Sequence, residues 1–340
     1  MAQEKHTDPG KEITMADAVS QDLPTTRYCA TPDVYTKQLA EQPGFAQARI
    51  ALDAEARALV SQGIFAAQTG ITRIPVVVHV VWNTHKDNIS ARQVNSQIAV
   101  LNKDFRKTNA DVSTLPAVFS PLADDAQIEF VLADIDPNGA ATRGITRTHT
   151  AVKSFTYDDA IKSAASGGAD AWPADKYLNL WVGSLGGGLL GYAQFPGGEA
   201  VTDGVVILNT AFGTVGSASP PFALGRTATH EIGHWLNLNH IWGDENGCIG
   251  TDKVNDTPNQ ASANTGKPVF PHVTCNNGPN GDLFMDYMDY VDDDVMVLFS
   301  VGQVARMHAC LEGPRNTFKL VEDSALAQKK RERIAGTDTT

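Results

Sequence analysis

The stretch THEIGHWLNLNHIWG, Thr229–Gly243, holds three histidines and one glutamate. His230 and His234 lie four residues apart, and on a helix this spacing places both imidazoles on one face, where they can bind one ion. Glu231 lies beside the first histidine and can reach a water molecule at that ion without being a ligand. Catalytic zinc takes three protein ligands and keeps its fourth position open. The stretch therefore predicts a zinc-binding helix with Glu231 as the general base.

His240 is the candidate for the third ligand, six residues beyond His234. A straight helix would carry it out of line, so the chain must turn sharply after the second ligand. Asn237 lies midway and is the predicted turning point, because asparagine tolerates a positive φ better than most residues other than glycine. A bare HExxH occurs by chance in many unrelated proteins. The third histidine at this further spacing is what favours a metal site.

The bulk composition excludes several classes of protein. Of 340 residues, 42% are hydrophobic, so the chain can bury a core, and the formal net charge is −12. Nucleic acids and anionic membrane surfaces require basic patches, so we expect neither as a partner. No apolar run reaches the length of a membrane span. The polar N-terminus MAQEKHTDPGKEITMADAVSQ shows no secretory signal.

Apolar patterns outside the histidine stretch predict a twisted sheet backed by helices. Ile74–Trp82, IPVVVHVVW, is a β-branched run typical of a buried strand. Ser90 is the predicted N-cap of a helix that runs to Thr108. Gly243–Ser300 is rich in Asp, Asn, Gly and Pro, and so long an irregular segment is more often functional than neutral. Further strands are predicted at 128–135 and 176–185 and in GGGLLGYAQFP and DGVVILNTAFG, and helices at 31–62, interrupted at Pro43, and at 301–313.

The stretch HEIGHWLNLNHIWG resembles the signature of the metzincin metallopeptidases, and within them the pappalysin family. The similarity extends over roughly 74–318. The metzincin pattern has glycine where this chain has Asn237, and by resemblance asparagine is an accepted substitute in this family. The resemblance implies a metzincin-like catalytic domain of class α/β (α+β), with a twisted, mostly parallel sheet, a backing helix, an active-site helix and a loop-rich C-terminal subdomain. It also implies a zinc-dependent endopeptidase that acts on proteins or peptides.

A second segment, DLFMDYMDYVDDD, is similar to the Met-turn of that family. By resemblance, Met288 is an apolar floor under the metal, and Tyr290 is the tyrosine that hydrogen-bonds the tetrahedral intermediate. Met285 and Tyr287 repeat the same spacing, so the assignment can also slip by three residues. We prefer Met288 because the acidic run follows it directly, as in the family.

The segment CIGTDKVNDTPNQ, at 248–260, also resembles the family. Oxygen ligands clustered in a loop suit calcium, and the candidates are Asp252, Asp256, Thr257 and the carbonyl of Val254. The alternative is a solvated polar loop. We expect Cys248 and Cys275 to form a disulfide that closes this irregular region.

The resemblance also implies a specificity. In related enzymes an acidic residue after the Met-turn shapes the pocket beyond the scissile bond, and Asp294 is our candidate among Asp292, Asp293 and Asp294. A carboxylate at the pocket floor would select Arg or Lys, so we expect cleavage on the amino side of Arg. The alternatives are a solvated acidic run and a cation site.

The N-terminal part has the features of an inhibitory pro-segment, with a disordered start followed by helices. We expect the pro-segment at 1–60, the catalytic domain at 61–322, divided near residue 240 into upper and lower subdomains, and a polar tail at 323–340. The segment RYCATPDVY contains Cys29, and thiolates bind zinc strongly. By resemblance Cys29 occupies the open metal position in a zymogen, and the competing interpretation is a disulfide between Cys29 and Cys310.

Two other classes of function remain to be weighed. One is a zinc-binding or lectin-like module without proteolytic activity, which would need neither Glu231 nor Tyr290. The other is a zinc amidohydrolase for small substrates, which a closed pocket would favour. We expect a monomer, and secretion is expected from the resemblance and the disulfide.

Overall fold

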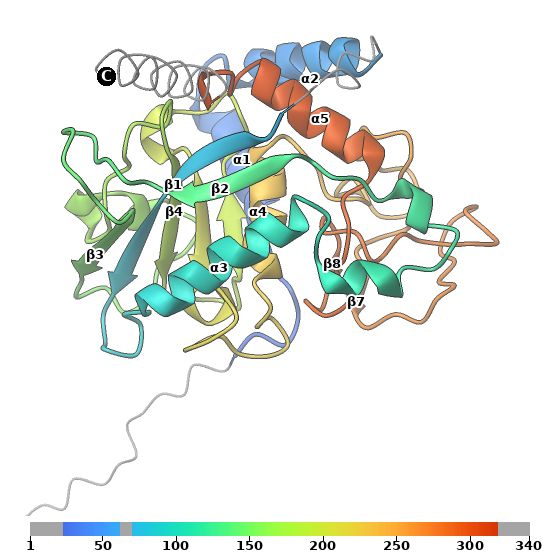
Figure 1. Ribbon diagram of the computed structural model, residues 1–340. Coiled ribbons are helices and arrows are strands. Elements are labelled where there is room, and N and C mark those ends of the chain that lie inside the picture. The colour runs from blue at the N-terminus through green and yellow to red at the C-terminus, as the bar shows by residue number, and fades with distance from the viewer. Residues whose placement is uncertain (1–22, 62–69, 319–340) are drawn as a thin grey trace, which may run out of the picture.

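The computed structural model describes residues 23–61 and 70–318 (Figure 1). The predicted tail at 323–340 and the start of the predicted pro-segment lie outside these residues, as does the 62–69 junction beside the predicted domain boundary. No helix of the described ranges is long and apolar enough to cross a membrane.

The centre of the fold is a six-stranded sheet with the order β2-β1-β4-β6-β5, in which β3 pairs with the second half of β1. All neighbours are parallel except the edge strand β5, which runs antiparallel to β6. A twisted, mostly parallel sheet is thus confirmed. The strands are β1 (Thr72–Trp82), β2 (Ile128–Leu132), β3 (Ile145–His149), β4 (Leu178–Gly183), β5 (Gly191–Ala193) and β6 (Val205–Leu208).

Two helices and the sheet build the main core. Helix α3 (Ala91–Asp104) crosses in front of the strands, and α4 (Arg226–Trp235) lies behind it (Figure 1). Side chains of α3 and α4 share one apolar cluster with β1. The predicted cap is confirmed, because the Ser90 hydroxyl accepts a hydrogen bond from the Gln93 amide at 3.1 Å. Both faces of β1 are buried, as expected for a parallel strand covered on two sides.

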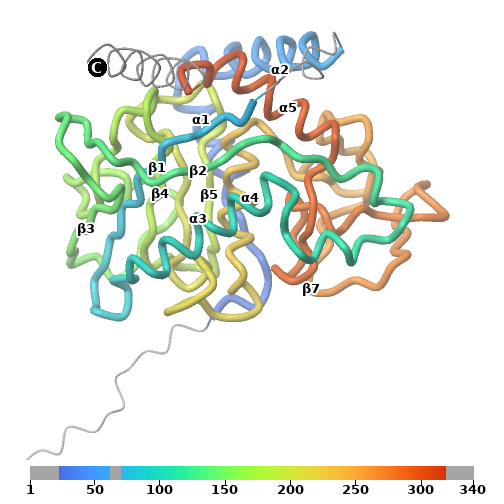
Figure 2. The backbone as a smooth tube through the Cα atoms, in the orientation of Figure 1, coloured from blue at the N-terminus to red at the C-terminus, as the bar shows by residue number. Residues whose placement is uncertain are grey.

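The N-terminal segment forms two helices, α1 (Thr31–Glu41) and α2 (Phe45–Ser61), and the predicted break at Pro43 is confirmed. Figures 1 and 2 show α2 beside α5 (Val301–Glu312). The Asp53 carboxylate of α2 joins them, because it pairs with Arg306 of α5 and with Lys253. Figure 2 also shows the blue N-terminal chain running between the sheet and the loop-rich part.

Residues 244–300 are mostly irregular, as predicted. Their regular structure is limited to a parallel pair of two-residue strands, β7 (Thr265–Gly266) and β8 (Tyr290–Val291). The predicted Cys248–Cys275 disulfide is present and closes a loop with a sequence separation of 27. Short 3₁₀ helices elsewhere span Ala110–Thr114, Ser120–Leu122, Ala160–Lys162, Ala164–Ser166, Ala200–Thr202 and Asn209–Ala211.

Candidate metal centre and active site

Helix α4 carries His230, Glu231 and His234, all of them buried, and it ends at the predicted turn. Asn237 has a φ of 76°, in the left-handed region. The Asn237 amide donates to the His234 carbonyl at 2.8 Å, and the Leu238 amide donates to the Gly233 carbonyl at 2.9 Å. This is the Schellman arrangement that ends helices sharply, and it returns the chain toward the metal-facing side. The turn predicted at Asn237 is confirmed.

The turn brings the third histidine to the other two. The Nε2 atom of His240 lies 3.2 Å from that of His230 and 3.0 Å from that of His234. Each ring is fixed through its other nitrogen. The Nδ1 atoms lie 2.7 Å from the Tyr287 carbonyl for His230, 2.7 Å from the Leu238 carbonyl for His234, and 2.6 Å from the Asp244 carboxylate for His240.

These contacts identify the tautomers and show that the residues fit a zinc ion. Each Nδ1 faces an oxygen acceptor and must carry the ring proton. The three Nε2 atoms therefore direct lone pairs at one point, an arrangement that is repulsive without a cation. Burial lowers the pKa of His230 and of His234 well below its usual value. A neutral imidazole fixed by an oxygen acceptor is the usual form of a zinc ligand.

The N-terminal segment places a thiol, a fourth group that can bind a metal, at this point. In the described part of the chain, Cys29 and the three histidines have donor atoms that all lie within 4.8 Å of one another. The Cys29 backbone also pairs with the sheet edge, where the Leu190 amide donates to the Tyr28 carbonyl at 2.9 Å. The alternative disulfide is wrong, because Cys29 and Cys310 are both free.

Glu231 is engaged by two residues of the N-terminal segment. The Cys29 thiol lies 3.3 Å from Glu231 Oε2, and the Thr31 hydroxyl donates to the same oxygen at 3.1 Å. Thr31 is held in turn by the Ala193 amide of β5, at 2.8 Å. Burial raises the pKa of Glu231 to about 8, against the opposing effect of these hydrogen bonds. Sequence reasoning missed Thr31, whose position two residues after Cys29 was the only available signal.

The structure brings the side chain of Tyr290, rather than that of Tyr287, to the histidines. The Tyr290 hydroxyl donates to the Cys29 carbonyl at 3.1 Å, and its ring packs edge-on against His240 and Trp242. The hydroxyl of Tyr287 instead accepts from Arg226 at 2.9 Å.

Met288 lies under α4, where Gly233 faces it. A Cβ atom at Gly233 would clash with the sulfur of Met288, so this position of the helix must be glycine while the methionine stays in place. Sequence reasoning did not single out Gly233.

In the acidic run 292–294, the predicted residue Asp294 lies at the surface. Asp294 is half exposed and pairs with Lys267 on the surface. Asp293 is fully buried and pairs with Arg27 of the N-terminal segment at 2.7 Å. Its second oxygen accepts from the Leu224 amide at 2.8 Å. Asp293, one residue before our candidate Asp294, is thus the buried carboxylate that meets an arginine side chain.

Three of the four candidate calcium ligands converge. The Thr257 hydroxyl lies 2.8 Å from an Asp252 carboxylate oxygen and 3.2 Å from the Val254 carbonyl. Asp256 points elsewhere. Its two oxygens accept from the Ser300 hydroxyl and the Gly302 amide, each at 2.8 Å, and so they cap helix α5.

Comparisons with known proteins agree with this geometry. The model of a peptidase family described as pregnancy-associated plasma protein-A matches residues 162–312. An extracellular metalloprotease of Pyricularia oryzae is 34% identical over 268 residues, which cover 75% of this chain and 80% of that protein. An extracellular metalloprotease of Verticillium alfalfae is 32% identical over 309 residues, which cover 87% of this chain and 93% of that protein.

Solved structures show the same fold. Mature mirolysin of Tannerella forsythia, in complex with a cleaved peptide, is 49% identical, with a TM-score of 0.74. The matched region covers 76% of this chain and 98% of the mirolysin chain. A glutamate-to-alanine mutant of promirolysin from the same organism is 43% identical with a TM-score of 0.78 and covers 87% of this chain and 97% of its own.

Proposed function

This chain belongs to the pappalysin family of zinc metallopeptidases, and on that premise we propose that it cleaves proteins before arginine and is held latent by its own N-terminal segment. It is a metalloendopeptidase that acts on peptides, so neither a binding module nor a small-substrate amidohydrolase describes it. The observation that carries the proposal is the convergence of three Nε2 lone pairs beside Glu231.

We assign zinc to His230, His234 and His240, whose proton-free nitrogens meet at one point. When bound there, zinc acidifies a water molecule and polarises the scissile carbonyl. The hydrogen bonds at the Nδ1 atoms keep the rings from turning, so the ligands are oriented before any metal binds.

Glu231 is the proposed general base and acid. Its carboxylate takes a proton from the attacking water and gives it to the leaving amine. Tyr290 donates its hydroxyl proton in a hydrogen bond to the developing oxyanion. In the present structure this hydroxyl donates to the Cys29 carbonyl, which occupies a position that a substrate carbonyl can take. Met288 would provide the apolar floor.

The preference for arginine is assigned to Asp293. The contacts of Arg27 support this assignment. Its guanidinium pairs with the Asp293 carboxylate, donates to the Thr227 hydroxyl at 3.1 Å and stacks 4.9 Å from the Phe222 ring centre. An aspartate fixed by backbone amides and a planar aromatic face suit a guanidinium better than an ammonium group.

We propose that residues 23–60 are the described part of an inhibitory pro-segment that spans 1–60. Cys29 would be the fourth zinc ligand, Thr31 engages the general base, and Arg27 fills the pocket. The match to promirolysin exceeds that to mature mirolysin by about a tenth of the chain, close to the length of residues 23–61, which supports this division. The catalytic domain would then follow at 61–322.

Three further assignments belong to this proposal. Calcium would be held by Asp252, Val254 and Thr257, with Asp256 outside the ligand set. Secretion is supported by the names of the relatives, which are called extracellular. The enzyme would act as a monomer.

Cleavage-site mapping tests this function. The activated enzyme is incubated with a peptide library derived from a whole proteome, and the new N-termini are identified by mass spectrometry. We expect arginine to follow the cleaved bond at most sites. A set of new N-termini without a basic preference would refute the assigned specificity, although not the zinc site.

A further inference from the structure

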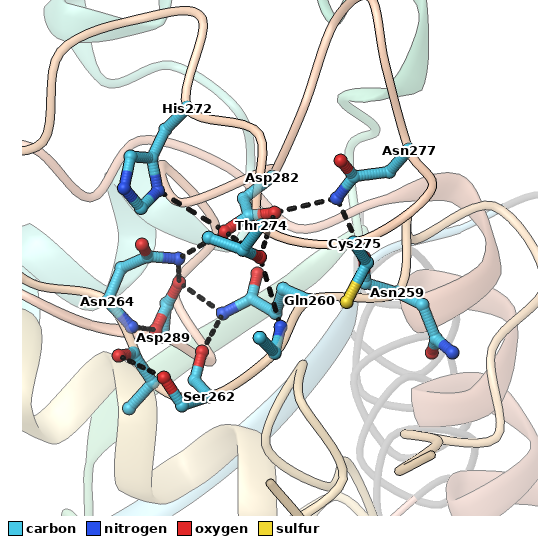
Figure 3. Close-up of polar contacts among 12 residues, drawn as sticks. Asn259, Gln260, Ser262, Asn264, His272, Thr274, Cys275, Asn277, Asp282 and Asp289 are labelled. Atoms are coloured by element: carbon cyan, nitrogen blue, oxygen red, sulfur yellow. Dashed lines mark hydrogen bonds and ion pairs between the residues drawn. The ribbon is translucent and has the colours of Figure 1, made fainter. Parts of the chain in front are cut away.

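Two fully buried carboxylates, Asp282 and Asp289, lie within the irregular segment and are linked by side-chain hydrogen bonds (Figure 3). Asn264 bridges them, because its Nδ2 atom donates to Asp282 at 3.2 Å and to Asp289 at 3.0 Å. The neighbouring donors on Asp282 include the Thr274 hydroxyl at 2.8 Å. Thr274 is next to Cys275, so the network begins at the disulfide.

The other end of the network holds the backbone at Tyr290. One oxygen of Asp289 accepts from the Tyr290 amide at 2.8 Å and from the Asn264 amide at 2.8 Å. The second oxygen accepts from Gln260 at 2.9 Å as well as from the Asn264 side chain. Burial raises the pKa of Asp289 to about 6, so at neutral pH it is a carboxylate that can accept all four bonds.

The local strands cannot fix Tyr290 by themselves. Strand β8 starts at this residue, and it pairs with β7 over two residues only. A two-stranded pair is marginally stable even when it is longer. The Tyr290 ring must nevertheless stay edge-on against the stacked rings of His240 and Trp242, with ring centres 4.8 and 4.7 Å away, for its hydroxyl to face the three histidines.

We propose that Asn264 and Asp289 are positioning residues that hold the Tyr290 hydroxyl where it meets the transition state. This inference rests on the role assigned to Tyr290 under the proposed function. Both residues are buried away from any substrate, so their effect on catalysis would pass through the tyrosine. A displacement of about 1 Å at a catalytic group can cost on the order of 100-fold in rate, and removal of one oxyanion donor costs a similar factor or more.

The test is a double-mutant cycle on the activated enzyme with an arginine-containing peptide substrate. The variants are Asn264→Ala, Tyr290→Phe and the double variant, with kcat and KM measured separately. We expect Asn264→Ala to lower kcat roughly tenfold or more with KM nearly unchanged. In the Tyr290→Phe background the same substitution should cost little, because the group that it positions is already gone.

A second readout and two further variants separate positioning from general damage. Affinity for a phosphinic-peptide transition-state analogue should fall with kcat, while affinity for the product peptide should not. Asp289→Asn keeps one acceptor oxygen and should retain more activity than Asp289→Ala. Asn102→Ala is the matched control. Asn102, in helix α3, also makes two side-chain hydrogen bonds to a backbone, that of Phe130 in strand β2. The kcat of this control should stay within about twofold of wild type.

The outcomes distinguish the proposed role of Tyr290 from the positioning role of Asn264 and Asp289. If Tyr290→Phe keeps full activity, the proposed role of Tyr290 fails, and this inference fails with it. If Tyr290→Phe is impaired but the effect of Asn264→Ala is additive, appears only in KM, or is matched by Asn102→Ala, then the positioning role alone is wrong.

Discussion

Each imidazole at the metal-binding point is fixed by the proton on its second nitrogen. Two of the three acceptors are backbone carbonyls, of Tyr287 and Leu238, so the fold itself orients His230 and His234. His240 uses the side chain of Asp244 instead. Loss of that carboxylate would therefore loosen one ligand and leave the other two in place.

The proposed specificity for arginine also depends on a single residue, and two adjacent aspartates allow a matched test. Asp293→Asn removes the charge that meets Arg27 in the pocket but keeps an oxygen acceptor for the Leu224 amide. We expect kcat/KM for an arginine substrate to fall roughly 100-fold, since a buried charge pair is lost. For the citrulline isostere the same substitution should change kcat/KM little.

Asp294→Asn is the control, because Asp294 meets only the exposed Lys267 among the described contacts. It should keep the wild-type preference. If Asp294→Asn loses arginine selectivity and Asp293→Asn keeps it, then Asp294, the residue suggested by the sequence, determines the specificity.

The sequence predicted residues whose spacing follows a regular geometry. His230 and His234 follow from the helical repeat, and Asn237 follows from the need for a turn. Asp293 and Asp294 could not be distinguished, because an irregular loop has no repeat that says which side chain points inward. Thr31 was missed for a related reason, since only the packed structure brings it to Glu231.

At the scale of elements, the N-terminal segment contacts the site through a short extended stretch and is anchored by its helices. The stretch from Arg27 to Thr31 reaches Asp293, the three histidines and Glu231. Helix α2 lies along α5, where Asp53 pairs with Arg306. Arg306 also donates to the Asn237 carbonyl at 2.6 Å. One guanidinium therefore contacts both helix α2, through Asp53, and the turn after α4.

Latency gives the prediction at this scale. Cys29→Ala removes the thiol beside the histidines, so the uncleaved chain should hydrolyse a peptide substrate at least about tenfold faster than the uncleaved wild type. Activity is read before processing begins, with intact mass as the check. Cys310→Ala removes the other free, buried thiol and should leave latency unchanged. A Cys29→Ala chain that stays as inactive as wild type until it is cleaved would contradict the zinc-blocking role.

Long elements could be predicted, and the shortest could not. The strand Ile74–Trp82 and the helix that Ser90 caps were visible in the sequence because their apolar patterns extend over many residues. Strands β7 and β8 have two residues each, and no pattern marks them. The residues that precede them, Asn264 and Asp289, are joined by hydrogen bonds that form only after the loops have folded.

At the scale of the whole molecule, the sheet buries a neutral histidine between strands. The His79 ring of β1 lies 2.8 Å from the Thr146 hydroxyl and 3.0 Å from Asn179 Oδ1. The Asn179 amide group donates to the Trp172 carbonyl at 3.0 Å, so its oxygen is the atom that faces the ring. His79 Nε2 therefore carries the proton, and Nδ1 accepts from Thr146.

This histidine makes global stability depend on pH. Burial lowers the pKa of His79 from 6.5 to about 4, opposed by its hydrogen bond to Asn179 and by Asp170. Above pH 6.5 neither state binds the proton, and the full stability is present. Between pH 6.5 and about 4 only the unfolded state binds it, so the free energy of unfolding falls by about 3 kcal/mol as the pH falls through this window.

Urea unfolding at several pH values checks this dependence. In His79→Gln the free energy of unfolding should fall less steeply between pH 6.5 and 4 than in wild type, whatever the stability of the variant at neutral pH. His85→Gln, at an exposed position, should keep the wild-type slope. An unchanged slope in His79→Gln would place the acid sensitivity elsewhere in the molecule.

In the proposed mechanism, three histidines hold zinc and Glu231 transfers the proton. The most direct measurement is the zinc content and the peptide cleavage rate of wild type and Glu231→Gln, after the same added protease has removed the N-terminal segment from both. We predict about one zinc per chain in each protein and a cleavage rate at least about 1000-fold lower in the variant. A variant that holds zinc and cleaves at a rate close to wild type, or a wild type that holds no zinc, would contradict the account.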